Sequence, residues 1–286
     1  MRQSGPVLEL TVPRPAPPIP RVPLAKTFRR VNRFARLNAF LARAMCEGMV
    51  YRALPGRKFD QAAKSRWLQV LCRRASRLLQ IEVGAEGRPP TGGLLVSNHL
   101  GYLDIIVLGS LRPMTFLSKS DVKNWPVIGA ITTMSGALYI EREHAKDVVR
   151  VAKQFEEVVD SGGVVGLFPE GTSSDGSGVL PFKSALLDPA IRGGWPVTPV
   201  WIGYALDDGS VADEVSYWRD MTFFPHLLNL LSKKTIRATV RYGSPTSPGT
   251  CRKELARSLH AEVCRLGKLR VDSRRLKPRG NAQWIE

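Results

Sequence analysis

Polar side chains whose types suit proton transfer interrupt an apolar stretch of the chain. Asn98, His99 and Asp104 lie between two apolar runs, and five positions separate the histidine from the aspartate. A neutral imidazole can take a proton from a hydroxyl group, and a carboxylate bonded to its other nitrogen fixes the tautomer and stabilises the imidazolium. Gly101 eases a turn into a helix. The spacing indicates a His–Asp base pair, and a structural histidine fits the local pattern equally well.

Two further strand-like runs also end in polar residues. Arg142 follows one of them, and an arginine suits bidentate recognition of phosphate or carboxylate. The segment FPEGTSS follows the other with a carboxyl group, a turn residue and a hydroxyl group: Glu170, Gly171 and Thr172. Such a loop can direct backbone N–H groups toward an anion. The plain alternatives are a surface salt bridge for Arg142 and an ordinary turn for the loop.

The position of these residues predicts that they lie near one another. Active sites in open α/β sheets collect at the carboxyl ends of the strands. A fourth segment, VTPV, is rich in β-branched residues and would line an apolar wall there with Thr198, Pro199 and Val200. The sequence has no G-x-S-x-G, no G-x-x-x-x-G-K-[ST], no H-E-x-x-H and no G-x-G-x-x-G after a strand. These absences disfavour a nucleophile-elbow hydrolase, a P-loop enzyme, a zinc protease and a dinucleotide-binding enzyme.

Apolar runs of strand length alternate with helical patterns through the middle of the chain. The strand-like runs cover 93–97, 114–118, 137–140, 164–168, 197–202 and 236–242. Apolar residues three or four positions apart predict helices over 144–159 and 252–266, and the glycines that follow Ser161 end the first one. Strands that alternate with helices favour an α/β fold with a central, mostly parallel or mixed sheet flanked by helices.

Two basic helical segments precede this part of the chain. Within 26–45, apolar residues recur at helical spacing and much of the remainder is basic: Phe28, Val31, Phe34, Leu37, Leu41 and Met45 against Lys26, Arg29, Arg30, Arg33, Arg36 and Arg43. A similar pattern covers 60–79. Basic amphipathic helices suit the interface of an anionic membrane. The alternative is a pair of helices packed on the domain with a solvated basic face.

These patterns divide the chain into four expected parts. They are a Pro-rich arm at 1–25, basic membrane-surface helices at 26–80, an α/β domain at 81–267 and a basic tail at 268–286. The first 25 residues lack the continuous apolar core of a secretory signal. No uncharged stretch approaches the ~20 residues that span a bilayer. We therefore expect any membrane contact to be peripheral.

The composition limits the partners and the compartment. The chain has 286 residues and a formal net charge of +17, which implies a polyanionic partner, either nucleic acid or an anionic membrane surface. Its four cysteines form no C-x-x-C pair, and the histidines are not clustered near them. We expect no metal site and a reducing compartment.

The four polar and β-branched blocks, in this order, resemble the glycerolipid acyltransferase family typified by bacterial 1-acyl-glycerol-3-phosphate acyltransferase. They match N-H-x4-D at 98–104, G-x-[IL]-[FY]-I-x-R at 136–142, F-P-E-G-[TS] at 168–172 and V-x-P-[VI] at 197–200. The resemblance covers roughly Val83–Gly243, and the motifs are specific as a set. It implies transfer of a fatty acyl group from a thioester to the hydroxyl of a lyso-lipid.

The resemblance also implies roles for individual residues. His99 would deprotonate the acceptor hydroxyl, and Asp104 would orient His99. The implied headgroup residues are Arg142, Glu170, Gly171 and Thr172, with Lys183 as a further candidate; the implied acyl-region residues are Thr198, Pro199 and Val200. No cofactor is implied, and acyl-CoA or acyl carrier protein would bring the acyl group. The enzyme would lie on the cytoplasmic face of the inner or plasma membrane.

The acceptor is less narrowly defined. The segment 215–231 resembles both lysophosphatidate and lyso-ornithine-lipid acyltransferases, and Ser173 stands where many phosphate-using members have arginine. We expect 1-acyl-glycerol-3-phosphate, with lyso-ornithine lipid or a phospholipid–lysophospholipid transacylase reaction as alternatives. A nucleic-acid binder is disfavoured because no RNP-like strand, helix-turn-helix or zinc finger is present. A catalytically inactive scaffold is disfavoured because His99 and Asp104 are both retained.

Overall fold

The computed structural model describes residues 24–53, 59–141 and 145–268. Most of the expected Pro-rich arm and basic tail therefore lies outside the described residues. The elements, in chain order, are α1 Leu24–Ala53, α2 Gln61–Leu79, β1 Ile81–Glu86, β2 Gly93–Ser97, α3 Tyr102–Leu111, β3 Thr115–Lys119, η1 Ser120–Asn124, α4 Ile128–Met134, β4 Leu138–Ile140, α5 Ala145–Asp160, β5 Val164–Leu167, η2 Ala185–Leu187, α6 Asp188–Gly193, β6 Val197–Leu206, α7 Val211–Glu214, α8 Phe223–Leu230, β7 Ile236–Tyr242 and α9 Arg252–Leu266.

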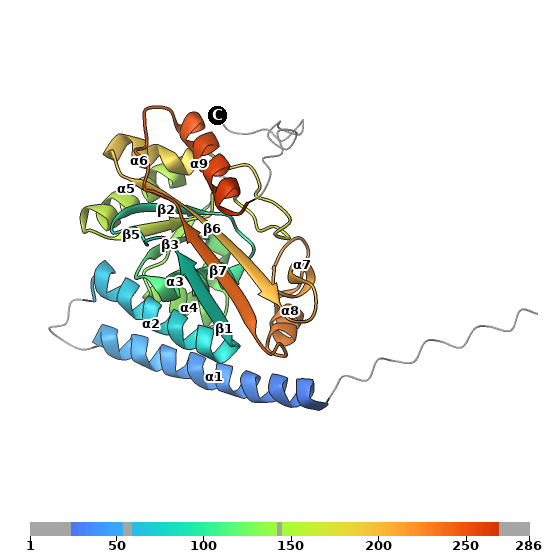
Figure 1. Cartoon of the computed structure of the whole chain (residues 1–286). Coiled ribbons are helices and arrows are strands. Elements are labelled where there is room, and N and C mark those ends of the chain that lie inside the picture. The colour runs from blue at the N-terminus through green and yellow to red at the C-terminus, as the bar shows by residue number, and fades with distance from the viewer. Residues whose placement is uncertain (1–23, 54–58, 142–144, 269–286) are drawn as a thin grey trace, which may run out of the picture.

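The strands form one central sheet that runs through the molecule (Figure 1). Its seven strands are ordered β1-β7-β6-β2-β5-β3-β4. All neighbouring pairs are parallel except β6 and β7, which are antiparallel. The predicted α/β fold with a mixed sheet flanked by helices is confirmed.

Helices cover both faces of the sheet because successive side chains of its central strands point to opposite sides. Leu95 of β2 packs with α3 on one face, in a cluster that includes Leu103 and Val107. Its neighbour Leu94 packs on the other face with residues of α5 and α9, including Phe155. β2 is buried along its whole length, and it therefore supports the turn that follows it from the middle of the core.

The observed strands and helices begin and end close to the bounds predicted for them, with two differences among the strands. The strand predicted at 197–202 continues to Leu206, because β7 pairs with it as far as Leu206 and Ile236. β1 was not predicted as a strand, since most of its side chains are at least partly exposed and give no apolar run. The helix predicted at 144–159 is α5, which ends at Asp160 before Gly162 adopts a positive φ of 78°.

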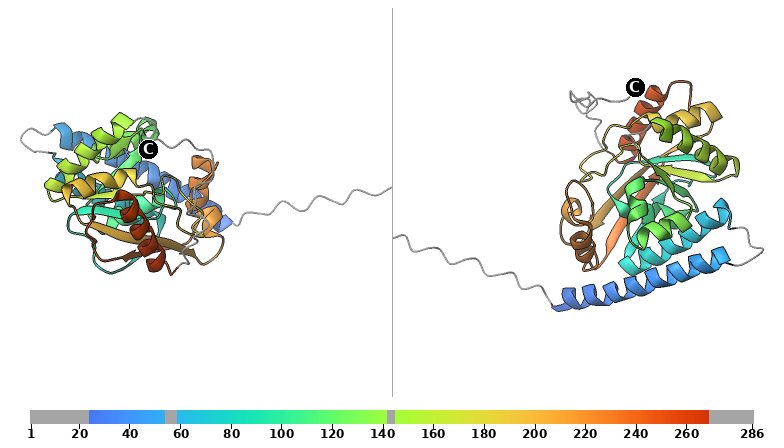
Figure 2. Two further views of the ribbon diagram at one scale, coloured as in Figure 1. Left: turned by 90° about the horizontal axis from the view of Figure 1, so that it is seen from above. Right: turned by 180° about the vertical axis from the view of Figure 1, so that it is seen from behind.

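α1 lies along the outer side of α2, away from the sheet (Figure 2). Its packed side carries Ala44 and Gly48, and a Cβ atom on Gly48 would come within 2.6 Å of the Met134 sulfur. Its outward side carries exposed apolar residues, with Phe28 and Val31 being 73% and 63% exposed. None of the helices within the described ranges is long and apolar enough to cross a membrane.

One basic residue of α1 is buried. Arg33 belongs to the basic residues of the 26–45 pattern, and it donates hydrogen bonds to the backbone carbonyls of Leu231, Lys233 and Lys234 in the segment between α8 and β7. Arg29 donates to the Ser232 carbonyl at 2.9 Å. These two arginines therefore attach α1 to the segment that joins α8 to β7.

Candidate active site

The candidate site begins where β2 ends. Asn98 follows the last residue of β2, and its side-chain amide donates to the Ile202 carbonyl at 2.9 Å and accepts from the Ile202 N–H at 2.8 Å. This buried amide continues the pairing between β2 and β6 after the backbone of β2 has turned away. The asparagine therefore fixes the start of the turn that holds His99.

His99 and Asp104 are in direct contact. The distance between His99 Nδ1 and Asp104 Oδ2 is 2.7 Å, and the same oxygen accepts from the backbone N–H groups of Leu100 and Gly101 at 2.6 and 3.0 Å. Asp104 is fully buried at the start of α3, whereas the His99 side chain retains 22% exposure. The carboxylate thus lies behind a partly accessible imidazole, as an orienting group for a base does.

Gly101 is required by the tight approach of two chain segments. Its φ is 153°, and a Cβ atom there would lie 2.9 Å from both the Cβ and the backbone nitrogen of Tyr217. The Tyr217 N–H also donates to the Leu100 carbonyl at 2.8 Å. The segment before α8 therefore packs directly against the turn that holds His99 and Asp104.

Glu170 reaches the same turn from the loop that follows the neighbouring strand β5. Its Oε1 accepts from the His99 backbone N–H at 3.2 Å, and the side chain is only 3% exposed. Burial raises the pKa of Glu170 to about 9, and the negative Asp104 adds to that effect, while backbone N–H groups of His99 and Leu180 act against it. The Phe168 ring stacks on the His99 imidazole with centroids 4.2 Å apart.

Gly171 and Lys183 lie beside Glu170. Gly171 adopts a φ of 73°, and a Cβ atom there would come within 3.0 Å of the Lys183 side chain. The Lys183 N–H donates to the Pro169 carbonyl at 2.8 Å. The side chains of Lys183 and Thr172 are both exposed. The loop therefore places the Lys183 side chain against Gly171, the residue that follows Glu170.

The remaining predicted residues are more remote or lie outside the described residues. Thr198, Pro199 and Val200 are buried in β6, in register with Leu95, Val96 and Ser97 of β2. Val200 packs in the same core cluster as Leu95. Arg142 follows β4 and lies outside the described residues.

Sequence reasoning missed one side chain at the centre of the site. The Tyr204 hydroxyl donates to Asp104 Oδ1 at 2.7 Å. Tyr204 belongs to the part of β6 that extends past the predicted strand end. No local spacing signals a contact between residues 100 positions apart, so only the tertiary structure reveals it.

The arrangement suits acid–base chemistry with an organic substrate. His99 has one ring nitrogen bonded to a carboxylate, which prepares the other nitrogen to accept a proton. Within the ranges that the structure describes, no group of three or more His, Cys, Asp or Glu side chains could hold a metal ion.

Comparison with known proteins defines the class. Residues 80–203 match the family model described as Acyltransferase. The chain belongs to this acyltransferase family, as close relatives covered over most of their length also show.

Two curated relatives and one solved structure carry more particular names. The chain is 32% identical over 198 residues to the 1-acyl-sn-glycerol-3-phosphate acyltransferase of Neisseria gonorrhoeae, covering 68% of this chain and 75% of that protein. It is 33% identical over 222 residues to the lyso-ornithine lipid O-acyltransferase of Brucella abortus, covering 72% and 83%. The fold matches the crystal structure of the 1-acyl-sn-glycerophosphate (LPA) acyltransferase PlsC from Thermotoga maritima, with a TM-score of 0.61, 16% identity and coverage of 86% and 98%.

Proposed function

We propose that this protein transfers a fatty acyl group from an acyl thioester to the hydroxyl of a lyso-lipid, with 1-acyl-glycerol-3-phosphate as the acceptor. The observation that carries the proposal is the 2.7 Å contact between the partly exposed His99 and the buried Asp104, at the end of a central strand. Membership of the acyltransferase family agrees with this chemistry.

In the proposed mechanism His99 is the general base. Its Nε2 takes the proton of the acceptor hydroxyl as the oxygen attacks the thioester carbonyl. A C–O bond forms, the C–S bond breaks, and the proton passes from His99 to the departing thiolate. Asp104 keeps the proton on Nδ1 and stabilises the imidazolium. General base catalysis as a whole contributes roughly 10²–10⁴-fold to the rate. No acyl-enzyme intermediate is required.

The headgroup would bind beside Glu170. A neutral carboxyl group there would donate a hydrogen bond to an anion rather than repel it, because burial raises the pKa of Glu170 to about 9. Gly171, Thr172, Lys183 and Arg142 would complete this headgroup site. Thr198, Pro199 and Val200 would shape the region that receives the acyl chain, and acyl-CoA or acyl carrier protein would deliver it.

Lyso-ornithine lipid is a second candidate acceptor, and a specific observation favours it. Ser173 stands where many phosphate-using members of the family have arginine, and its hydroxyl donates to the Tyr217 carbonyl. The site therefore lacks a cation at that position of the motif. A relative named for lyso-ornithine lipid is as similar to this chain as one named for 1-acyl-sn-glycerol-3-phosphate.

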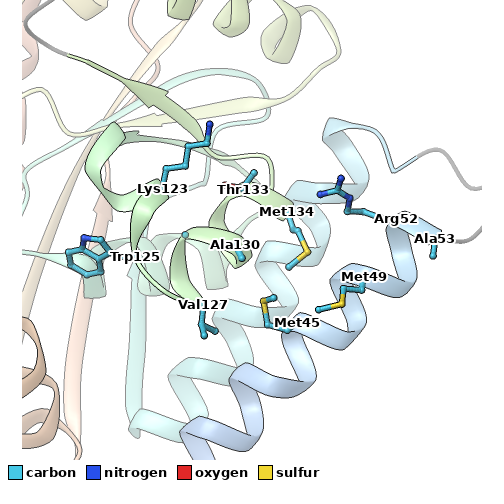
Figure 3. Close-up of a pocket in the computed structure, with 11 residues that line it drawn as sticks. Met45, Met49, Arg52, Ala53, Lys123, Trp125, Val127, Ala130, Thr133 and Met134 are labelled. Atoms are coloured by element: carbon cyan, nitrogen blue, oxygen red, sulfur yellow. The ribbon is translucent and has the colours of Figure 1, made fainter.

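The lyso-lipid would arrive from an anionic membrane surface, with the enzyme peripheral on the cytoplasmic face. Exposed apolar side chains on α1 and α8 support this orientation: Leu24, Phe28, Val31, Met49 and Phe224. A cavity of about 650 Å³ lies between α1 and the η1–α4 segment, and three methionines, Met45, Met49 and Met134, line it (Figure 3). Flexible apolar side chains of this kind adapt to apolar partners of irregular shape, and lipid tails are partners of this kind.

Complementation separates the acceptors. The gene would be expressed in a bacterial host that lacks lysophosphatidate acyltransferase, and growth would be scored. We expect growth to return. No growth, together with new ornithine lipid when a source of lyso-ornithine lipid is co-expressed, would select the second acceptor. Transfer by purified protein from phospholipid alone, but not from acyl-CoA or acyl carrier protein thioester, would select a transacylase instead.

A further inference from the structure

The two carboxylate oxygens of Asp104 have different partners. Oδ2 contacts His99 and accepts from two backbone N–H groups of the turn. Oδ1 accepts from the Tyr204 hydroxyl at 2.7 Å. Tyr204 is therefore the side chain that reaches Asp104 from the sheet, while His99 reaches it from the turn.

Asp104 lies where solvent cannot replace a lost partner. Its side chain is 0% exposed, and a buried acceptor that loses its donor keeps the full penalty of its burial. The titratable groups that act on Asp104 are His99 from the turn, Tyr204 from β6 and Glu170 from the loop after β5. Burial and the negative Asp104 raise the pKa of Tyr204 well above its usual value, so its hydroxyl keeps its proton and remains a donor.

The sheet holds Tyr204 in place independently of the turn. Tyr204 pairs with Ala238 of β7, and two residues earlier in β6 the backbone of Ile202 forms both bonds to the Asn98 amide. β6 therefore contacts the turn at two points. The Ile202 backbone bonds to the Asn98 amide, and the Tyr204 hydroxyl bonds to the Asp104 carboxylate. Rigid support of this kind is what keeps a site within its productive geometry.

We propose that Tyr204 is a positioning residue for acyl transfer: its hydroxyl fixes the orientation of the Asp104 carboxylate, and Asp104 in turn holds the proton of His99 on Nδ1. The inference rests on the proposed function of His99 as the base. Without the hydroxyl, the Asp104 carboxylate can turn away from Nδ1, and His99 can then adopt the tautomer that carries its proton on Nε2. That tautomer cannot accept a proton from the substrate at Nε2.

The kinetic test compares Tyr204→Phe with Tyr242→Phe in the full-length chain. Tyr242 is a matched control because it is a buried tyrosine on the adjacent strand β7 whose hydroxyl has no hydrogen-bond partner among the described residues. We expect Tyr204→Phe to lower kcat by about 10- to 100-fold with little change in KM, because a hydrogen bond to a charged group is lost. Tyr242→Phe should match the wild type in both respects.

A spectroscopic test does not depend on turnover. The chain has four histidines, so ¹⁵N NMR of imidazole-labelled protein is simple, and the His99 signals are those missing from His99→Gln. We expect the Nδ1–H tautomer in the wild type and a mixture in Tyr204→Phe. If Tyr204→Phe does not fold, 3-fluorotyrosine placed at 204 keeps the hydroxyl as a stronger donor and should shift the His99 Nδ1 signal.

The proposal fails if kcat and the His99 tautomer are unchanged in Tyr204→Phe, if Tyr242→Phe loses as much kcat, or if the fluorinated residue leaves the His99 signal unmoved. These outcomes are separate from failure of the proposed function. A wild type that transfers no acyl group to any acceptor would contradict the function, while the tautomer measurement would still decide whether Tyr204 controls His99.

Discussion

Glu170 and Asp104 are two buried carboxyl groups at one site with different hydrogen-bond partners. Asp104 accepts from His99, from two backbone N–H groups and from the Tyr204 hydroxyl. Glu170 is also buried, but burial dominates and raises its pKa to about 9. At neutral pH the Glu170 carboxyl group is therefore neutral, and it lies beside the proposed headgroup position.

Glu170 also makes a prediction about stability. Its pKa is near 4.5 in the unfolded chain and about 9 in the folded one, so between these values the folded state holds a proton that the unfolded state has released. The free energy of unfolding must then fall as pH rises through this range. Glu170→Gln cannot ionise, so its melting temperature relative to the wild type should rise from pH 5 to pH 9. Thermal unfolding across that range measures it.

The exposed Glu156 of α5 supplies the control for this prediction. Glu156→Gln should follow the wild type at every pH, because the side chain is exposed. A Glu170→Gln variant that melts in parallel with the wild type from pH 5 to pH 9 would show that Glu170 is ionised in the folded protein.

Sequence spacing was sufficient for some residues of the site and not for others. His99 and Asp104 could be predicted because they are five positions apart in one turn, and Glu170 because it follows a neighbouring apolar strand. Tyr204 and the role of Asn98 could not, since their partners are 100 and 104 positions away. A side chain that acts across two strands leaves no local pattern.

At the scale of elements, the basic residues of α1 have two different roles. Arg29 and Arg33 bind the carbonyls after α8, whereas Arg36 is exposed. Sequence periodicity placed these arginines in a single class, because it records spacing but not which neighbour packs against the helix. The amphipathic pattern predicted a helix correctly, but it could not reveal that Arg33 binds backbone carbonyls that follow α8.

The attachment of α1 can be tested by substitution. Arg33→Met retains the apolar stem but removes three hydrogen bonds to backbone carbonyls, two of them buried, so we expect a loss of about 1–3 kcal/mol in the free energy of unfolding. Hydrogen exchange in the first half of α1 should also become faster. Arg36→Met, on the same helix but exposed, should leave both unchanged. Equal stability of the two variants in urea would contradict the role of Arg33.

At the scale of the whole molecule, α1 presents apolar side chains outward beside an excess of positive charge. The net charge of +17 favours an anionic surface, and Phe28 and Val31 are available to enter it. Arg29 of the same helix binds the Ser232 carbonyl after α8, and the segment before α8 contacts the turn that holds His99 through Tyr217. The proposed membrane side and the active site are thus joined by continuous packing.

Flotation with liposomes tests this orientation. The wild type should float with vesicles that contain phosphatidylglycerol and much less with phosphatidylcholine alone, and added salt should weaken the binding. Phe28→Ser combined with Val31→Ser should reduce partitioning by about 10-fold or more, because two large apolar side chains no longer enter the bilayer. Val149→Ser, at a 67% exposed position on α5, is the control. Equal flotation of all three proteins would exclude α1 as the membrane-binding element.

The central claim is that His99, held by Asp104, is the base for acyl transfer. The most direct measurement is the rate at which purified protein transfers a radiolabelled acyl group from acyl-CoA to 1-acyl-glycerol-3-phosphate or to lyso-ornithine lipid. The wild type is compared with His99→Ala, and circular dichroism checks that both proteins are folded to the same extent. We predict transfer by the wild type to at least one acceptor and a loss of about 10²–10⁴-fold or more in His99→Ala. A folded His99→Ala protein that retains most of the wild-type rate would contradict the account.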